Sequence, residues 1–134
     1  MRNVLLLLVF AAALTAGCKK DTAGYSKTAL AGSWQYDNSE IDTMLNGQWT
    51  FLRNEYDPEV PNIFAGQLYF TLTDTVYYTY HGITTWSNYT VDGKNLVLIG
   101  SAISDTLVLR NVTGTNMQAG LAQPPYYYWL NFKR

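Results

Sequence analysis

The feature that most constrains this fold is a succession of short strand-like segments from Gly47 to the C-terminus. In most of them apolar and polar residues alternate, which is the period of a strand with one buried face. Short turn sequences separate the segments, and Asp92-Gly93 is among the strongest two-residue hairpin signals. We expect eight strands, at residues 48–53, 66–73, 75–81, 83–91, 94–100, 106–112, 113–122 and 126–134.

These short connections predict that each strand pairs antiparallel with the next strand along the chain. A meander of eight strands closes readily into a barrel, which removes both exposed sheet edges. The sequence therefore predicts the all-β class and a small eight-stranded antiparallel up-and-down β-barrel. A sandwich of two sheets is the alternative that the same pattern leaves open.

One segment ahead of the first strand has the signals of a short helix. Ser39 is a favourable N-cap residue, and Glu40 and Asp42 would lie near the positive end of the helix dipole. Asn46-Gly47 is typical of a helix stop. We therefore expect one or two helical turns at residues 39–45.

The N-terminus has the three-part layout of a secretory signal. A cationic start precedes an apolar run at residues 4–14, which is shorter than the roughly 20 residues of a membrane-spanning helix. The sequence "LTAGC" then resembles the lipobox of bacterial lipoproteins, in which the signal is removed before the cysteine and the cysteine is acylated. This predicts a signal peptide at 1–17, a lipidated Cys18 within a flexible tether at 18–30, and a folded domain at 31–134.

Lipidation accounts for a cysteine without a partner, and two or more acyl chains anchor a protein stably. A soluble secreted protein cut near Gly17, with a leftover thiol, is the alternative. Lys19 and Lys20 stand where an aspartate would favour retention at the inner membrane, so we expect the outer membrane. The run "CKKD" resembles a surface-export signal in part, and both the periplasmic side and the cell surface stay open.

Charge and composition exclude some classes of partner and of cross-link. With Arg2 removed together with the signal, 8 basic residues face 10 acidic ones, a formal charge of −2. Nucleic acid selects a strongly basic face, so we expect no nucleic-acid partner. No disulfide is expected, because Cys18 is the one cysteine. The abundant aromatic rings, with eleven Tyr, four Trp and five Phe, supply buried area instead.

A Gly-x-Trp sequence, Gly47 to Trp49, opens the first expected strand, and a long loop at 54–65 follows it. A short helical turn, this motif and a run of hairpins together resemble the lipocalin superfamily. More narrowly, the chain is similar to small lipocalin-like lipoproteins of Gram-negative bacteria over residues 39–134. Gly32-Ser33-Trp34 is a second copy of the motif, and it is an equally good candidate for the start of the first strand.

The resemblance implies that the motif's tryptophan, Trp49, plugs the closed end of the barrel. It also implies that a basic residue near the last strand, Lys133 or Arg134, packs over that ring in a cation–π contact. The barrel-closing set is therefore expected to be Gly47, Trp49 and Arg134. This chain departs from the family in having no disulfide, no room for a C-terminal helix, and shorter strands.

An eight-stranded barrel is either filled by side chains or holds one small ligand. Alternation places Val76, Tyr78 and Tyr80 on one face of their strand. In the last strand the more apolar face is the better candidate for the inside; it carries Tyr126, Tyr128, Leu130 and Phe132. Aromatic core packing is the ordinary interpretation of such rings. If a pocket exists, the candidate ligand-binding residues are Tyr78, Tyr80, Trp86, Tyr126 and Tyr128.

The sequence gives little support for an enzyme, a metal or a cofactor. The one histidine, His81, precedes Gly82 and is typical of a turn residue, and no thiol accompanies it in the mature chain. Glu55, Asp57 and Glu59 alternate in the long loop, where they form either a calcium site or a solvated acidic stretch. We expect no catalytic residues, no metal and no cofactor.

The expected function is therefore that of a non-enzymatic, outer-membrane-anchored lipoprotein. It binds a small hydrophobic or aromatic ligand at the open end of its barrel. The rival from another class is a protein-interaction module with a filled barrel, acting as an envelope accessory subunit or an inhibitor. A cavity of about 300 Å³ or more is what a small-ligand site usually needs.

Overall fold

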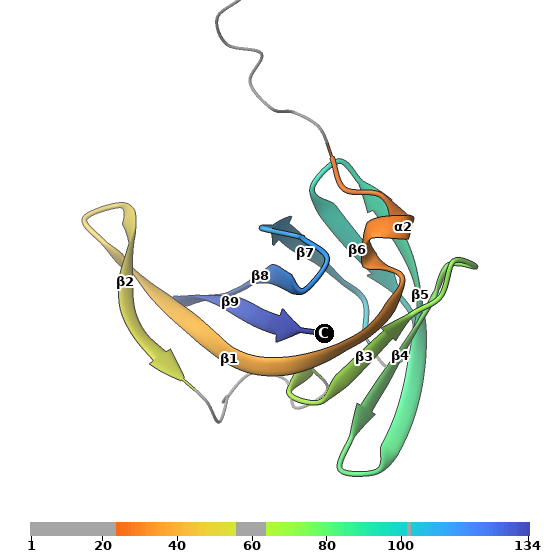
Figure 1. The fold of residues 1–134 in the computed structure, drawn as a ribbon. Coiled ribbons are helices and arrows are strands. Elements are labelled where there is room, and N and C mark those ends of the chain that lie inside the picture. Colours follow the sequence, from red (N-terminus) through yellow and green to blue (C-terminus); the bar gives the residue numbers. More distant parts are fainter. Residues whose placement is uncertain (1–23, 56–63, 102) are drawn as a thin grey trace, which may run out of the picture.

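The computed structural model describes residues 24–55, 64–101 and 103–134. The predicted signal peptide, Cys18, the start of the tether, Asp57 and Glu59 lie outside the described residues. In chain order the elements are α2 (Lys27–Leu30), β1 (Gly32–Leu45), β2 (Gln48–Glu55), β3 (Gln67–Phe70), β4 (Thr75–Tyr80), β5 (Ile83–Asp92), β6 (Asn95–Ile99), β7 (Asp105–Arg110), β8 (Asn116–Gln123) and β9 (Tyr126–Lys133) (Figure 1). None of the helical segments in these described ranges has the length and hydropathy of a membrane span.

The strands form one antiparallel sheet in the order β2-β1-β3-β4-β5-β6-β7-β8-β9, and a further pairing of β1 with β9 closes it. Eight strands, β1 and β3 to β9, make the closed barrel, so the predicted eight-stranded up-and-down barrel is confirmed. The geometry is compatible with a lipocalin-like fold. The predicted number of barrel strands is right, but one of the predicted strands is not in the ring. β2 is an additional strand, and β1 takes its place in the ring.

β1 is long enough to serve two neighbours along one edge. Its first residues, 32–35, pair with β3, and residues 39–45 pair with β2. On the opposite edge, residues 35–43 pair with β9. The second half of β1 and the whole of β2 therefore form a hairpin, at the left of Figure 1, in which β1 belongs to the barrel wall and β2 lies outside the ring.

Residues 39–45 belong to this strand, so the predicted helical turns there are wrong. Ser39 and Ile41 are buried while the residues between and after them are partly exposed, which is the two-residue period of a strand. Asn46 and Gly47 have φ angles of 51° and 77° and form the two-residue turn into β2. Both positions of a type I′ hairpin turn need positive φ, which Asn and Gly adopt most readily.

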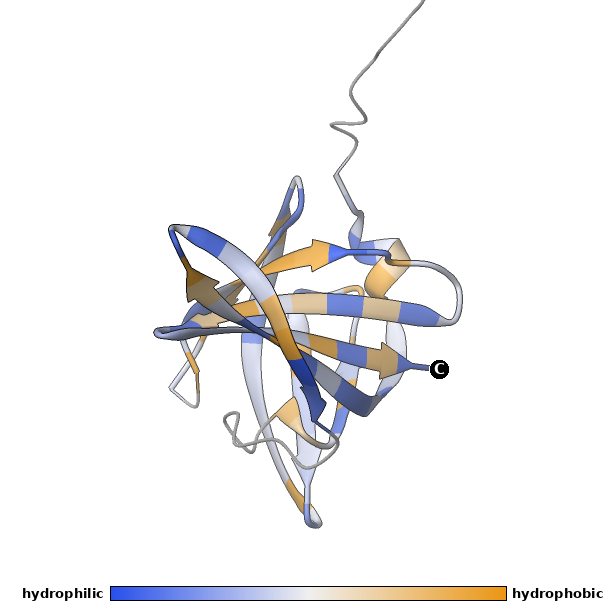
Figure 2. Cartoon of the chain, turned by 90° about the vertical axis from the view of Figure 1, so that its left-hand side faces the viewer, coloured by the Kyte–Doolittle hydropathy of each residue, from blue (hydrophilic) through white to orange (hydrophobic). Residues whose placement is uncertain are grey.

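The core lies inside the barrel and is built from the inward residues of every ring strand. Tyr128, Leu130 and Phe132 of β9 are buried, so the predicted inner face of the last strand is confirmed. Val76 and Tyr78 of β4 are also buried, which identifies the inner face of a strand for which the sequence left both faces open. Apolar and polar residues alternate along the strands in Figure 2. Edge-on ring contacts, such as Phe70 with Tyr89 at 5.1 Å, join strands across the interior.

The end of the barrel beside α2 is closed around Trp34. This ring is fully buried, and its indole Nε1 donates a hydrogen bond of 2.7 Å to the carbonyl oxygen of Leu30. The guanidinium of Arg134 lies over the ring, with Cζ 4.0 Å from the ring centroid. Arg134 Nη2 also donates to the carbonyl oxygens of Ala29 and Ala31, at 3.2 and 2.6 Å. Because Leu30 is also fully buried, the packed domain begins before residue 31.

The barrel's own Gly-x-Trp is therefore Gly32 to Trp34. The prediction that Gly47 and Trp49 close the barrel under Arg134 is wrong, although Arg134 does cover a motif tryptophan. The reason is the tight turn at residues 46–47, which places the second copy of the motif on the extra strand β2. Trp49 is 45% exposed there.

Candidate functional site

The interior of the barrel is filled by side chains. The cavity left among the described inner residues has a volume of about 10 Å³, and its lining includes Phe64, Tyr78 and Met117. Phe64, ahead of β3, packs edge-on against Tyr78 with ring centroids 6.0 Å apart. Small-molecule sites usually enclose about 300 Å³ or more. The described part of the interior thus has no room for a ligand of that size.

Tyr78 stands out within this interior. Its side chain is 1% exposed, and its hydroxyl makes no hydrogen bond of ordinary geometry within the described ranges. Burial raises the pKa of Tyr78 to about 12, and the neighbouring Ser87 hydroxyl counteracts part of that rise. The hydroxyl is therefore neutral at physiological pH and contributes to packing.

The structure does not gather the predicted ligand-binding residues at one site. Tyr78 and Tyr128 are core residues, and Tyr80 and Tyr126 are partly buried. Tyr126 and Tyr128 contact each other, with ring centroids 6.3 Å apart. Trp86 lies on the outer wall and is 56% exposed.

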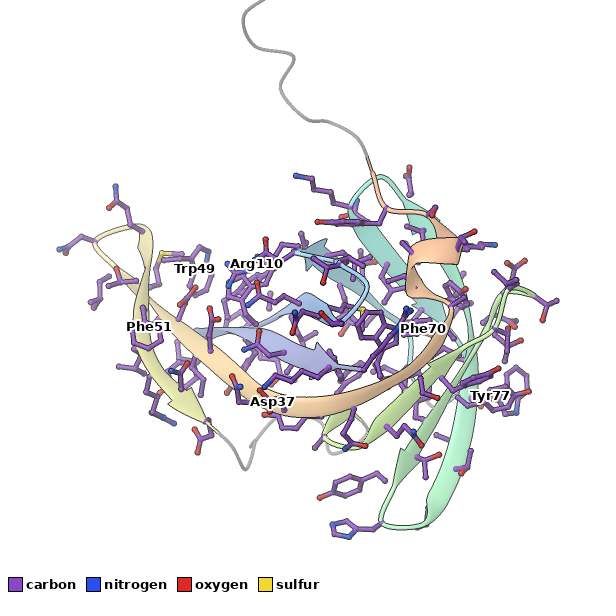
Figure 3. All side chains as sticks on the ribbon, in the orientation of Figure 1. Asp37, Trp49, Phe51, Phe70, Tyr77 and Arg110 are labelled. Atoms are coloured by element: carbon purple, nitrogen blue, oxygen red, sulfur yellow. The ribbon has the colours of Figure 1, made fainter. Side chains whose placement is uncertain are left out.

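Trp86 belongs to a row of outward aromatic residues that crosses β3, β4 and β5. Tyr69 of β3 is paired with Tyr77 of β4, which is paired with Trp86 of β5. Tyr77 is labelled at the right of Figure 3. The side chains of these three residues are between 40% and 56% exposed.

A groove with aromatic walls lies instead on the outer face where β2, β1, β9 and β7 come together. We call it the aromatic groove; its volume is about 230 Å³, and it is lined by Asp42, Trp49, Arg110, Tyr127 and Trp129. Trp49 and Arg110 project toward each other above β9 in Figure 3. Residues from four strands thus form one concave surface outside the barrel.

The aromatic rings of this groove contact one another in sequence. The ring of Trp49 meets Tyr127 at 5.5 Å and 60°, and Tyr127 meets Trp129 at 5.0 Å. Gly120 of β8 lies beneath them, because a Cβ built there would collide with the Tyr127 hydroxyl and lie 2.7 Å from the Trp129 ring. The missing side chain at Gly120 therefore allows both rings to lie against the sheet.

Arg110 is fixed in the groove by three partners. Its Cζ lies 3.6 Å from the centroid of the Trp129 ring. Nη2 donates to Glu40 Oε2 at 2.7 Å, and Nε donates to Gln118 Oε1 at 2.9 Å. Burial raises the pKa of Tyr127; the charge of Arg110 opposes this rise, and that of Asp42 adds to it. Glu40 therefore balances the charge of the Arg110 guanidinium, and Gln118 and Trp129 help to hold this group in place.

A second, polar groove of about 410 Å³ adjoins the aromatic groove on the same wall. Its lining is rich in amides and charges, and includes Asp37, Asn38, Glu40, Asn54, Asn111, Asn116, Gln118, Asn131 and Lys133. The outward residues of β9 explain the arrangement, because Tyr127 and Trp129 line the aromatic groove whereas Asn131 and Lys133 line the polar one. The Glu40–Arg110 ion pair joins the two grooves.

Side-chain hydrogen bonds run across the polar groove from strand to strand. Gln118 Nε2 donates to Asn131 Oδ1 at 2.6 Å, and Asn131 Nδ2 donates to Asn38 Oδ1 at 2.7 Å. Asn38 Nδ2 donates to Asp37 Oδ2 at 2.7 Å, and Lys133 pairs with the same oxygen at 2.8 Å. Polar groups are therefore ordered along this wall before any ligand arrives.

Two of the remaining candidates, His81 and Glu55, lie in the described part of the chain. His81 has a φ of 48° in the turn between β4 and β5, so its prediction as a turn residue is confirmed. Glu55 pairs with Arg53, at 3.0 Å between Oε2 and Nε. Among the residues with described placement, no group of three or more His, Cys, Asp or Glu side chains has the arrangement of a metal site.

Sequence reasoning missed most residues of the aromatic groove. Alternation did separate Tyr127 and Trp129 from the inner face of their strand, but it did not indicate what covers the outer face. The missed signal was Asn46-Gly47, which as a hairpin turn folds Trp49 back toward β9. Comparison of the chain with protein-family models, curated proteins and solved structures gave no match.

Proposed function

We propose that this protein is a non-enzymatic binding protein of the Gram-negative envelope, anchored in the outer membrane by a lipid on Cys18, and that its ligand binds in the aromatic groove on the outer wall. The observation that carries the proposal is the difference in volume between the interior of the barrel and the grooves on its outer wall. The described interior leaves about 10 Å³, whereas the two adjoining outer grooves have about 230 and 410 Å³. Of these three spaces in the described part of the chain, the two outer grooves approach the size of small-molecule sites and the interior does not.

The position of the N-terminal segment agrees with this assignment. The described chain begins at Gly24 and enters α2, which covers the end of the barrel closed by Trp34. Asp42 and Trp49 belong to the β1–β2 hairpin, which lies away from that segment in Figure 1. Attachment through the N-terminus therefore leaves the aromatic groove accessible.

Native mass spectrometry of the full-length protein, purified from its own host, tests the site. We expect the wild type to carry a non-covalent mass, and we expect Trp49→Ala to lose at least nine tenths of it. Trp86→Ala is the matched control, because it removes another tryptophan that is about half exposed but does not line the aromatic groove, and it should keep the mass. A mass retained by Trp49→Ala would exclude the aromatic groove as the site.

The anchor has a separate test. Replacing Cys18 by Ser removes the acylated thiol, so we expect the protein to leave the membrane fraction for the soluble fraction after cell breakage. A parallel variant, Ser33→Ala, changes an exposed side chain inside the folded domain and should stay with the membranes. A Cys18→Ser protein that still sediments with membranes after residues 1–17 have been removed would contradict lipid anchoring.

One observation favours a second function, binding of an envelope protein through β2. Five large apolar side chains of the β1–β2 hairpin are exposed: Met44, Leu45, Trp49, Phe51 and Leu52. β2 pairs only with β1 within the described chain, and an unpaired edge strand can accept a partner's strand. If this function holds, a tagged protein will recover a stoichiometric partner from membranes, and Phe51→Lys will lose it. Recovery of no such partner from wild-type membranes would count against it.

A further inference from the structure

We propose that the ligand of the aromatic groove is a neutral saccharide, with a sugar ring against Trp49 and its hydroxyl groups on Asp42 and Arg110. This inference rests on the proposed function and assigns the chemical class of its ligand. Aromatic walls and ordered polar groups occur in one continuous outer surface. An apolar ligand would use only the aromatic walls, whereas a saccharide can bind to both.

The aromatic walls fit the apolar face of a sugar. A pyranose ring presents several C–H groups on one face and hydroxyl groups around its edge. Trp49 is 45% exposed, and it meets Tyr127 at an angle of 60°, so the two rings form a corner. The flat, rigid ring of a tryptophan or tyrosine offers a large contact area at little cost in conformational entropy.

The polar groups of the groove require a ligand with hydroxyls. Within the described residues, no hydrogen bond or ion pair occupies the carboxylate of Asp42, although this residue lines the groove. A purely apolar ligand would cover this charge without pairing it, which is costly. A sugar hydroxyl can donate to Asp42, and its oxygen can accept from an N–H of Arg110.

The charges of the groove favour a neutral ligand. An anionic ligand would meet Asp42, and it would have to compete with Glu40 for Arg110. A cationic ligand would find aromatic rings and Asp42, but the guanidinium of Arg110 already lies over Trp129. Asp42 thus repels an anion and Arg110 repels a cation, whereas a hydroxyl group can donate to the one and accept from the other.

The polar groove extends the site along the same wall. Its amides, which include Asn38, Gln118 and Asn131, both donate and accept, as hydroxyl groups do. The outward residues of β9 from Tyr127 to Lys133 cover about 20 Å at the usual strand rise. That length suits a chain of several sugar units, with the aromatic groove holding one of them.

The test begins with the compound that the protein brings from its host. The compound is released from wild-type protein by denaturation and its sugar content is measured after acid hydrolysis. We expect sugars in wild-type and Trp86→Ala samples and none in Trp49→Ala samples. A released compound without sugar, absent from Trp49→Ala, would overturn the saccharide and leave the proposed function standing. A compound that persists in Trp49→Ala would overturn both.

If the purified protein carries no compound, titration with four neutral tetrasaccharides decides the question. Cellotetraose, maltotetraose, mannotetraose and xylotetraose are added up to millimolar concentration, and tryptophan fluorescence is followed. We expect at least one to bind, Asp42→Asn to weaken it about tenfold, and Trp49→Ala to abolish it. Asp42→Asn preserves side-chain size, and thermal unfolding checks that each variant folds. Absence of binding by all four, or binding unaffected by both substitutions, would overturn the inference.

Discussion

At the scale of single residues, Arg134 links three parts of the fold. It lies over the buried ring of Trp34 and donates hydrogen bonds to the carbonyl oxygens of Ala29 and Ala31, which flank the end of α2. Lys133, its neighbour, forms an ion pair with Asp37 at the surface of the described domain. We therefore expect these two adjacent cations to contribute differently to the stability of the fold.

We expect Arg134→Ala to lower the free energy of unfolding by about 2 kcal/mol, through loss of the cation–π contact and of charged hydrogen bonds. Arg134→Lys keeps the charge but not the planar group, and should lose about 1 kcal/mol. Lys133→Ala is the control, with a loss under about 1 kcal/mol, as for exposed ion pairs. Urea unfolding measures all three. Equal losses for Arg134→Ala and Lys133→Ala would contradict the role given to Arg134.

Tyr78 offers a prediction at two pH values. At pH 7, Tyr78→Phe removes a buried hydroxyl that has no hydrogen bond of ordinary geometry in the described chain, so stability should rise by about 1 kcal/mol. Tyr77→Phe, at an exposed position of the same strand, should leave the stability at pH 7 nearly unchanged.

At higher pH the direction follows from the raised pKa of Tyr78. Its pKa is about 12 in the folded protein and 10.0 in an ordinary environment, so the unfolded chain loses this proton first. Stability from Tyr78 is therefore complete below pH 10 and falls as pH rises toward 12. Unfolding measured between pH 9 and 11 should show a steeper decline for wild type than for Tyr78→Phe. Identical declines would contradict a buried, neutral hydroxyl.

How far the sequence predicts single residues is illustrated by the two Gly-x-Trp motifs. Gly32-Ser33-Trp34 and Gly47-Gln48-Trp49 are equivalent as local patterns. What distinguishes them is non-local, because only Trp34 lies beneath Arg134, a hundred residues later in the sequence. The sequence could predict that a cation lies over a motif tryptophan. It could not predict which of the two tryptophans this is, because that depends on which strand closes the barrel.

At the scale of elements, the β1–β2 hairpin is the part most separable from the rest. β2 contributes no fully buried residue and pairs only with β1 among the described strands. Its turn depends on Gly47, with a φ of 77° and open space around the position of a Cβ. Backbone conformation, not crowding, is therefore what Gly47 supplies.

We expect Gly47→Ala to destabilise the hairpin by about 1 kcal/mol, because an L-residue disfavours the left-handed conformation. Amide hydrogen exchange in β2 should accelerate about fivefold while exchange in β4 and β5 stays as in wild type. Gly114→Ala is the matched control, since a Cβ there also meets open space and φ is not left-handed. Equal acceleration in the hairpin and the barrel would show that they open only together.

Strand positions from residue 66 onward were predictable, because alternation and tight turns agree there. Asp92-Gly93 marked a real hairpin, although Asp92 is paired with Asn95 and the loop residues are Gly93 and Lys94. The first strand was missed because Ser39 and Asn46-Gly47 carry helix-terminus signals as well as strand and turn ones. Local residues left that choice open, and pairing of β1 with β3 and β9 decides it.

At the scale of the whole molecule, barrel closure was predictable and the contents of the barrel were not. Eight short strands with short connections favour closure, and the β1–β9 pairing provides it. Whether large rings leave a cavity depends on how side chains from different strands fit together. Phe64 and Tyr78 meet inside although no local pattern relates them, and the described lumen is reduced to about 10 Å³.

The central claim is that ligand binding takes place on the outer wall. The four tryptophans of the chain report on separate places: Trp34 on the interior, Trp49 and Trp129 on the aromatic groove, and Trp86 on the outer face of β5. Their indole N–H signals can be followed by two-dimensional NMR while the compound released from host-purified protein is added back. We expect the signals of Trp49 and Trp129 to shift and those of Trp34 and Trp86 to stay in place. A shift of Trp34 with Trp49 unmoved would place the ligand inside the barrel and contradict this account.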